Sequence, residues 1–332
     1  MVSAEDVHTI ADGLTVGTLL RRNATEHSDL PALTSGIDAD ARTWTWSELR
    51  ADTAAAARGL EGLGLATGDR MMIMMATRQE HWIADLGAMT LGAIPCTAYA
   101  TLSTEQIRFV ARQSAATVVV LDGAEQLRRW LPLLDDLPAL RRVVVVDEQS
   151  IPDGDDRFVS YRGLLAEGRA AHEKDPAVFE RLTDARKPQD PLCMLYTSGT
   201  TGDPKGVVIS HHNAIWECAS LDLLVPIDEP HPRTVSYLPL AHIAERALSF
   251  YMLLYQVGHC TICPDQSQLL ATLGTVHPHE LFGVPRVWEK FAAGVATRLS
   301  ALPDEQRTAI EGARKVATEV FRRRADGEEV PA

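Results

Sequence analysis

Ten consecutive residues near the middle of the sequence carry groups suited to binding a nucleotide triphosphate. The segment 197–206 combines four hydroxyl side chains, three glycines, a proline and a single lysine. Glycines let a loop turn its backbone N–H groups toward one anion, hydroxyls add further donors, and Lys205 adds a point charge. The composition therefore predicts a phosphate-binding loop. In order, the segment reads Thr197, Ser198, Gly199, Thr200, Thr201, Gly202, Asp203, Pro204, Lys205 and Gly206.

Two predicted strands flank this loop. Residues 192–196 form an apolar run typical of a buried strand, and residues 207–209 are β-branched, which also predicts a strand. A Walker A loop instead opens a helix and has serine or threonine after its lysine, where this sequence has Gly206. The alternative is an ordinary turn, because glycine, proline, serine and threonine are common turn residues. Turns between strands usually take about two to five residues, so the length favours a phosphate loop of another kind.

With its neighbours, the loop resembles the signature of the adenylate-forming enzymes, which include acyl-CoA synthetases, luciferases and peptide-synthetase adenylation domains. Residues 196–206 match that signature at its glycine, proline and lysine positions. A second block, Leu-Pro-Leu-Ala-His-Ile-Ala-Glu-Arg at 238–246, resembles the long-chain fatty acyl-CoA synthetases more than the small-acid or amino-acid branches. Phe-Gly-Val-Pro-Arg-Val-Trp-Glu-Lys at 282–290 points to the same branch. Residues 42–49 are similar to the segment where this fold usually begins.

The resemblance implies an enzyme that activates a fatty acid with ATP and Mg²⁺ to an acyl-adenylate and then transfers the acyl group to coenzyme A. Lys205 would reach the β- or γ-phosphate, and His242 would face the carboxylate, so these two are the implied catalytic residues. The remaining loop residues would bind the phosphates: Thr197, Ser198, Gly199, Thr200, Thr201 and Gly202. Thr200 is the candidate magnesium ligand, although it and Thr201 could equally cap the turn.

Other polar residues near these blocks admit structural interpretations. His242 could simply be a polar histidine at the start of a helix. His211 precedes a helix that Asn213 is expected to cap, and capping is as good an explanation as ligand contact. Glu245 and Arg246 could pair with each other or with nearby charges. Residues 248–255 are apolar on nearly every side, which predicts a buried core helix whose face could also line an acyl tunnel.

Several signatures that would complete the site are not found in the sequence. They are a Gly-x-Thr-Glu segment for adenine and magnesium, a Thr-Gly-Asp after the phosphate loop for the ribose, and a small C-terminal domain with a catalytic lysine. We therefore expect the chain to be the N-terminal part of such an enzyme and inactive alone. Two alternatives stay open: a nucleotide- or lipid-binding homologue without turnover, and an adenylating enzyme that loads a carrier protein.

Composition narrows the class of protein further. The net charge of −13 and the lack of a basic stripe argue against a nucleic-acid partner. Five cysteines lie mostly in apolar runs, which indicates reduced, buried thiols and a cytoplasmic protein. Cys260 and Cys263 have CxxC spacing, but no second pair completes a zinc site.

No membrane signal is evident in the sequence. Residues 1–13 are polar and acidic, unlike a signal peptide. No apolar run reaches the roughly 20 residues that a transmembrane helix needs. The sequence therefore predicts no transmembrane segment, and it leaves peripheral membrane contact and oligomeric state open.

Strand and helix patterns alternate along the chain, which predicts an α/β fold with largely parallel sheets covered on both faces. The charged stretch 184–190 is the best internal boundary. We therefore expect two layered α/β subdomains, residues 1–186 and residues 187–332, the second carrying the phosphate loop and being incomplete. Strands are expected at 70–75, 94–98, 117–121 and 143–146 and near Val235, His259 and Leu281, and helices at 79–91, 103–113 and 125–134.

Overall fold

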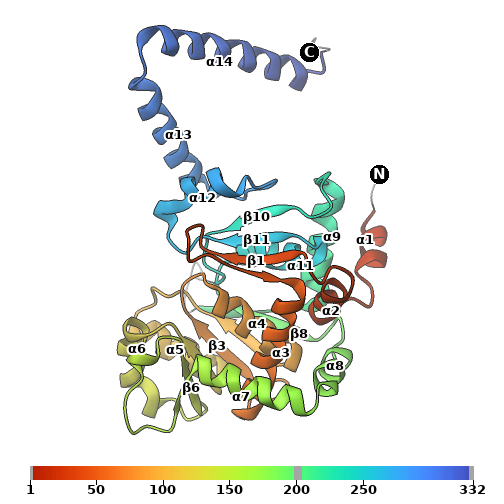
Figure 1. Cartoon of the computed structure of the whole chain (residues 1–332), viewed down its shortest axis with the longest axis vertical. Helices are drawn as coiled ribbons and strands as arrows, with labels where there is room; N and C mark the ends of the chain where they lie inside the picture. Colours follow the sequence, from red (N-terminus) through yellow and green to blue (C-terminus); the bar gives the residue numbers. More distant parts are fainter. Residues whose placement is uncertain (1–2, 198–203, 329–332) are drawn as a thin grey trace. The chain divides into compact units, whose positions relative to one another are not determined.

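The computed structural model describes residues 3–197 and 204–328, and the chain divides into two compact units, residues 1–281 and residues 282–332 (Figure 1). The first unit contains both sheets and the helices that cover them. The strands are β1 Pro31–Ser35, β2 Arg42–Thr45, β3 Arg70–Met74, β4 Ile94–Thr97, β5 Val118–Leu121, β6 Arg142–Val145, β7 Phe158–Ser160, β8 Pro191–Thr197, β9 Lys205–Ser210, β10 Arg233–Ser236 and β11 His259–Ile262.

The helices of the first unit precede, separate and follow these strands in the sequence. They are α1 Ala4–Ala11, α2 Val16–Glu26, α3 Trp46–Gly62, α4 Gln79–Leu91, α5 Thr104–Ser114, α6 Ala124–Trp130, α7 Tyr161–Lys174, α8 Ala177–Asp184, α9 His211–Leu224, α10 Ile243–Glu245, α11 Met252–Gln256 and α12 Leu269–Val276. A π-helix, Arg246–Tyr251, joins α10 to α11. Many of the helices begin at a serine or threonine that accepts a backbone N–H, such as Thr45 of α3 and Ser103 of α5.

A seven-stranded sheet with the order β7-β6-β5-β3-β4-β8-β9 forms the larger layer, and every neighbouring pair except β8 and β9 is parallel. Its central strands are rich in valine and methionine, so side chains of both faces are buried. Met72 and Met74 pack with α5 and α6 on one face, whereas Met71 and Ile73 pack with α3, α4 and α7 on the other. The prediction of a largely parallel sheet covered on both faces is confirmed.

A second sheet of four strands has the order β10-β11-β1-β2. β10, β11 and β1 are parallel, and β2 is antiparallel to β1. The expected boundary at residue 186 does not divide the two sheets, because β8 and β9 join the strands that precede it and β1 pairs with the later strand β11. Backbone pairing over long sequence distances outweighs the local charge signal at 184–190.

Most predicted elements of the first unit are present near the expected limits, such as the helix at 79–91. The two strands around the phosphate loop are also present, but they include Thr197, Lys205 and Gly206, which the prediction placed in the loop. The expected strand near Leu281 is wrong, because residues 281–284 have no regular structure. The expected helix at 125–134 becomes a 3₁₀ helix over Leu131–Asp136, where Pro132 lies in the first turn.

The second unit consists of the helices α13 Pro285–Ser300 and α14 Asp304–Ala325, and none of their described residues is buried. Within it, Trp288 donates its indole N–H to the Gly283 carbonyl at 2.8 Å. In the described part of the chain, no helix combines the length and apolar character needed to cross a bilayer.

Candidate active site

A pocket of about 340 Å³ opens where the parallel strands β4 and β8 end. Thr97 is the last residue of β4 and Thr197 is the last residue of β8, and both line the pocket. The carboxyl ends of parallel strands are the usual place for ligand sites in α/β folds, because the loops that follow can surround a ligand there.

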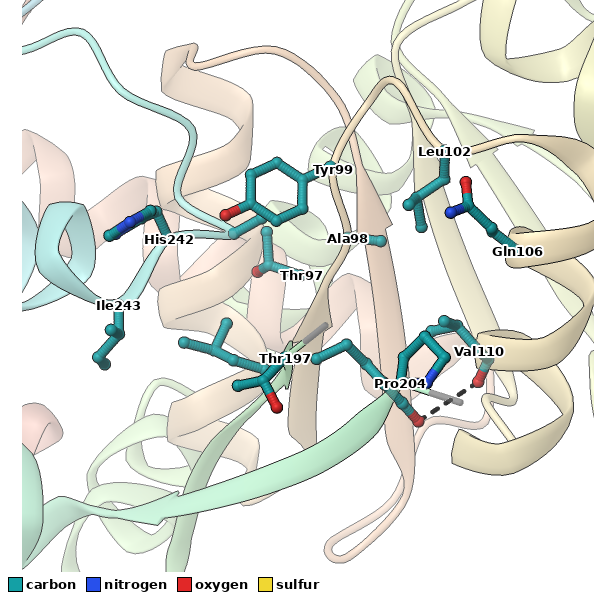
Figure 2. Close-up of a pocket in the computed structure, with 13 residues that line it drawn as sticks. Thr97, Ala98, Tyr99, Leu102, Gln106, Val110, Thr197, Pro204, His242 and Ile243 are labelled. Atoms are coloured by element: carbon teal, nitrogen blue, oxygen red, sulfur yellow. Dashed lines mark hydrogen bonds between the residues drawn. The ribbon is translucent and has the colours of Figure 1, made fainter. Parts of the chain in front are cut away.

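Three segments complete the walls of this pocket. Figure 2 shows His242 and Ile243 on one side and Leu102, Gln106 and Val110 on the opposite side. Tyr196 also lines the pocket and donates its hydroxyl to the Val110 carbonyl at 3.4 Å. The lining is mainly apolar, with a few hydroxyl, amide and imidazole groups: Thr97, Ala98, Tyr99, Leu102, Gln106, Val110, Leu195, Tyr196, Thr197, Pro204, Ala241, His242 and Ile243.

The predicted phosphate loop adjoins this pocket directly. Thr197 and Pro204, which flank residues 198–203, both line the pocket, as Figure 2 shows. The predicted ligands Ser198, Gly199, Thr200, Thr201 and Gly202 lie outside the described residues. No arginine or lysine is among the described residues that line the pocket, so a bound anion would depend on a charge from elsewhere.

Lys205 is the first residue of β9 and pairs with Thr197 across the antiparallel ladder. Its side chain is exposed, and the residue does not line the pocket as described. A long flexible stem carries the ammonium group of a lysine, so the position of the charge is not fixed by the strand.

His242 lines the pocket and lies at the start of α10. Its hydrogen bond there shows which ring nitrogen is free to donate. It is the N-cap of α10, and its Nδ1 accepts the backbone N–H of Ala244 at 3.2 Å. A nitrogen that accepts a hydrogen bond carries no proton, so the proton of a neutral imidazole lies on Nε2. The ring therefore offers a hydrogen-bond donor at Nε2, which suits an oxyanion. The helix-start interpretation and the ligand interpretation of His242 are compatible.

Arg246, beside this wall, is the centre of a polar network that the sequence pattern did not predict. Its guanidinium is fully buried and donates to Asp85 Oδ1 at 2.7 Å, Thr97 Oγ1 at 2.9 Å and the Tyr251 hydroxyl at 3.0 Å. Tyr251 in turn donates to Cys193 Sγ at 3.3 Å. Because Thr97 also lines the pocket, this network forms the layer directly beneath the pocket floor.

Glu245 precedes Arg246 and binds different partners. It accepts a hydrogen bond from the Ser236 hydroxyl at 2.6 Å, and only 2% of its surface is exposed. Burial raises the pKa of Glu245 to about 7, although hydrogen bonds from Ser236, Ser249 and the backbone of Leu238 and Tyr237 favour the charged form. Glu245 therefore titrates near neutral pH.

His211 lies away from the pocket. Its ring is buried, and Nδ1 accepts the backbone N–H of Val16 at 3.1 Å, at the first turn of α2. Burial lowers the pKa of His211 to about 4, so the ring is neutral at pH 7. The N-cap of α9 is Ser210, not Asn213. Asn213 is the third residue of the helix, and its side chain accepts the Ser210 N–H to complete a reciprocal capping box.

The apolar segment 248–255 forms most of the π-helix and α11, so the predicted buried helix is confirmed. Phe250, Tyr251, Leu253 and Leu254 belong to the main hydrophobic core, and none of these residues lines the pocket at the strand ends. The five cysteines are free and buried, and burial raises the pKa of Cys96 to about 12. A thiol with so high a pKa is not an effective nucleophile.

The sequence analysis missed the pocket residues between Thr97 and Val110. The signal was available, because Thr97 ends a predicted parallel strand and a ligand is expected at that edge of the sheet. The partners of Arg246 could not be predicted from the local sequence, because Asp85 lies 161 residues earlier in the chain. Among the described residues, no group of three or more His, Cys, Asp or Glu side chains could hold a metal ion.

The chain is an α/β protein with two sheets, and its pocket lies where two parallel strands end, beside both flanks of the hydroxyl-rich segment. The sequence profile of the AMP-binding enzymes matches residues 20–326. This chain belongs to the AMP-binding enzyme family, which confirms the resemblance drawn from its motifs.

Similar proteins point to one branch of that family. A long-chain-fatty-acid–CoA ligase of Xenopus laevis is 29% identical over 283 residues, which cover 83% of this chain and 38% of the relative. One from Mycobacterium tuberculosis is 33% identical over 247 residues, 74% of this chain and 39% of the relative. The chain thus spans about two fifths of the length of the curated relatives that it matches.

Solved structures agree on the fold. The inhibitor-bound N-terminal domain of FACL13 from Mycobacterium tuberculosis has a TM-score of 0.60 at 26% identity, over 78% of this chain and 60% of that one. An anthranilate CoA ligase in complex with anthranoyl-AMP has a TM-score of 0.65 at 19% identity, over 82% of this chain and 50% of that one. The second similarity bears on the fold alone.

Proposed function

We propose that this chain forms the phosphate-loop part of a long-chain fatty acid–CoA ligase. The observation that carries the proposal is the pocket at the ends of β4 and β8, bordered by both flanks of the hydroxyl-rich loop. The curated relatives named above are long-chain-fatty-acid–CoA ligases, which supports the substrate class.

In the proposed reaction, a fatty acid carboxylate attacks the α-phosphorus of ATP in line and displaces pyrophosphate. The thiol of coenzyme A then attacks the acyl carbon of the acyl-adenylate and displaces AMP. Neither step needs a protein nucleophile, so the protein acts by positioning and by offsetting negative charge. His242 Nε2–H would donate to an oxyanion in the pocket, and Lys205 would offset charge on the outgoing phosphates.

Magnesium would assist by neutralising the triphosphate when bound. The predicted ligand, Thr200, lies outside the described residues, and the described pocket residues include no carboxylate. We therefore assign the metal no step and keep Thr200 as a proposal.

Acid chain length tests this function directly. Fatty-acid-dependent pyrophosphate release by the complete enzyme should be measured with acids from acetate to palmitate. Each CH₂ that becomes buried contributes about 0.8 kcal/mol, which corresponds to about a fourfold rise in kcat/KM until the acyl site is full.

The series also separates the rival functions. Flat specificity, or a preference for amino or aromatic acids, would contradict the long-chain assignment while leaving adenylation intact. Turnover that requires a carrier-protein thiol in place of coenzyme A would identify the carrier-loading alternative. An enzyme that binds ATP but releases no pyrophosphate with any acid would be the non-catalytic homologue.

A further inference from the structure

Glu245 and Arg246 are consecutive charged residues, both buried, and their side chains bind different segments near the pocket. Glu245 is 2% exposed and Arg246 is fully buried. Burying two charges is costly unless each has partners of good geometry. The partners of these two side chains therefore indicate what the charges stabilise.

Glu245 holds the loop that carries His242. This loop, residues 237–242, runs from the end of β10 to the start of α10. The Ser236 hydroxyl donates to Glu245 Oε1 at 2.6 Å, and backbone groups of Tyr237 and Leu238 also bind the carboxylate. The Leu238 carbonyl accepts from Thr77 Oγ1 at 2.8 Å. The beginning of the loop is therefore bound on both sides.

The end of the same loop is equally constrained. The His242 N–H donates to the Pro239 carbonyl at 2.9 Å, and the Arg246 N–H donates to the His242 carbonyl at 3.2 Å. These two bonds constrain the backbone at His242, and the Ala244 N–H holds the ring by donating to Nδ1 at 3.2 Å. Figure 2 shows the imidazole at the edge of the pocket.

Arg246 holds a second residue that lines the pocket. Its Nη1 donates to Thr97 Oγ1 at 2.9 Å, which fixes the last residue of β4 at the pocket floor. Its Nη2 is held by Asp85 Oδ1 at 2.7 Å, and its Nε donates to the Tyr251 hydroxyl at 3.0 Å. Arg246 and Tyr251 are five residues apart at the two ends of the π-helix, and a π-helix brings residues with that spacing together.

We propose that Glu245 and Arg246 are positioning residues that hold two pocket-lining residues, His242 and Thr97, at a fixed separation. The assignment rests on the proposed function, because acid activation is the reaction that would use the pocket. Because Glu245 and Arg246 are adjacent in the chain, the segment that carries His242 is coupled to Thr97. A displacement of one would be transmitted to the other.

This arrangement makes the site sensitive to pH through Glu245. The charged carboxylate accepts several hydrogen bonds, whereas the protonated form has one oxygen that is a donor and binds the loop less well. Burial raises the pKa of Glu245 to about 7. The titratable groups that face it are Tyr237 and, from β11, Cys260, and burial raises the pKa of both, so both are neutral at pH 7.

Kinetics of the complete enzyme test the proposal, with kcat and KM for ATP and palmitate measured from pH 6 to pH 9. Glu245→Gln keeps the shape of the side chain and removes its titration. We expect a loss of about tenfold or more in kcat/KM at pH 8, the usual effect of losing a hydrogen bond to a charged group. We also expect the wild-type decline below pH 7 to be absent from the variant.

A double variant tests Arg246. Asp85→Leu with Arg246→Met replaces the buried ion pair by apolar side chains, an exchange that is often neutral for stability. We expect urea unfolding close to that of the wild type and a loss of about tenfold or more in kcat. If the double variant does not fold, the pH profile of Glu245→Gln decides the proposal alone.

Asp52→Asn is the matched control. Asp52 is another buried carboxylate of the same unit, bound by Trp44 Nε1 at 2.9 Å and Arg169 Nη2 at 2.6 Å, and it does not line this pocket. Its variant should lower stability without moving the pH profile. A wild-type enzyme that shows no acid-dependent turnover would overturn the proposed function. An active wild type with an unaltered Glu245→Gln profile would overturn the positioning role alone.

Discussion

Replacing His211 with asparagine should make the first unit of this protein less sensitive to acid without impairing its activity. The ring of His211 is buried and neutral, and its Nδ1 accepts the backbone N–H of Val16. Asparagine can place its side-chain oxygen near the position of Nδ1, so the hydrogen bond to α2 is kept. His211→Asn therefore removes the titration of this residue while preserving its structural contact.

The magnitude follows from the shift in the pKa of His211. Burial lowers that pKa to about 4, whereas an unfolded histidine titrates near 6.5. Between these values the unfolded chain binds the proton and the folded chain does not, so the contribution is present above pH 6.5 and is lost as the pH falls toward 4. The total is about 3 kcal/mol, of which about 2 kcal/mol lies between pH 7 and pH 5.

Urea unfolding at pH 7 and pH 5, followed by circular dichroism, measures this difference. The wild type should lose about 2 kcal/mol more of its unfolding free energy than His211→Asn over this interval. His81 is also buried, with a pKa lowered to about 3, so it adds acid sensitivity that is common to both proteins and cancels. Equal losses in the two proteins would refute the reasoning. A large drop in kcat/KM at pH 8 would instead place His211 in the active site.

Four further outcomes are expected. The raised pKa of Glu245 makes stability fall as the pH rises, opposite to the effect of His211, because the folded state binds the proton between about pH 4.5 and 7. From pH 5 to pH 8, the wild type should therefore lose about 2–3 kcal/mol more unfolding free energy than Glu245→Gln. Lys205→Ala in the complete enzyme should lower kcat/KM for ATP about tenfold to a hundredfold with little change in unfolding, and an unchanged value would remove Lys205 from the site. Residues 1–332 alone should not release pyrophosphate with any fatty acid, because the adenine, ribose and lysine signatures are not in the sequence; robust release would show otherwise. Leu248→Glu, at a half-buried position in the apolar segment, should reduce turnover of palmitate far more than that of acetate once the variant is shown to fold, and equal effects would argue against an acyl site there.

Local sequence determined several features of this protein. The valine-rich runs that became β5 and β6 predict buried parallel strands without any knowledge of their neighbours, because β-branched residues favour extended backbone and apolar side chains on both faces need cover. The residue types of the hydroxyl-rich loop likewise predict phosphate binding, and they were enough to indicate the family. Features of this kind depend on residues close together in the chain.

Tertiary structure alone decided which distant groups meet. Nothing local indicates that Asp85 neutralises Arg246, that β1 pairs with β11, or that Thr97 and Thr197 line the same pocket. Buried polar groups take whichever partners the packing brings within reach, and strand order depends on which apolar faces must be covered. The sequence therefore determined the chemistry that is available, and long-range packing determined where that chemistry comes together.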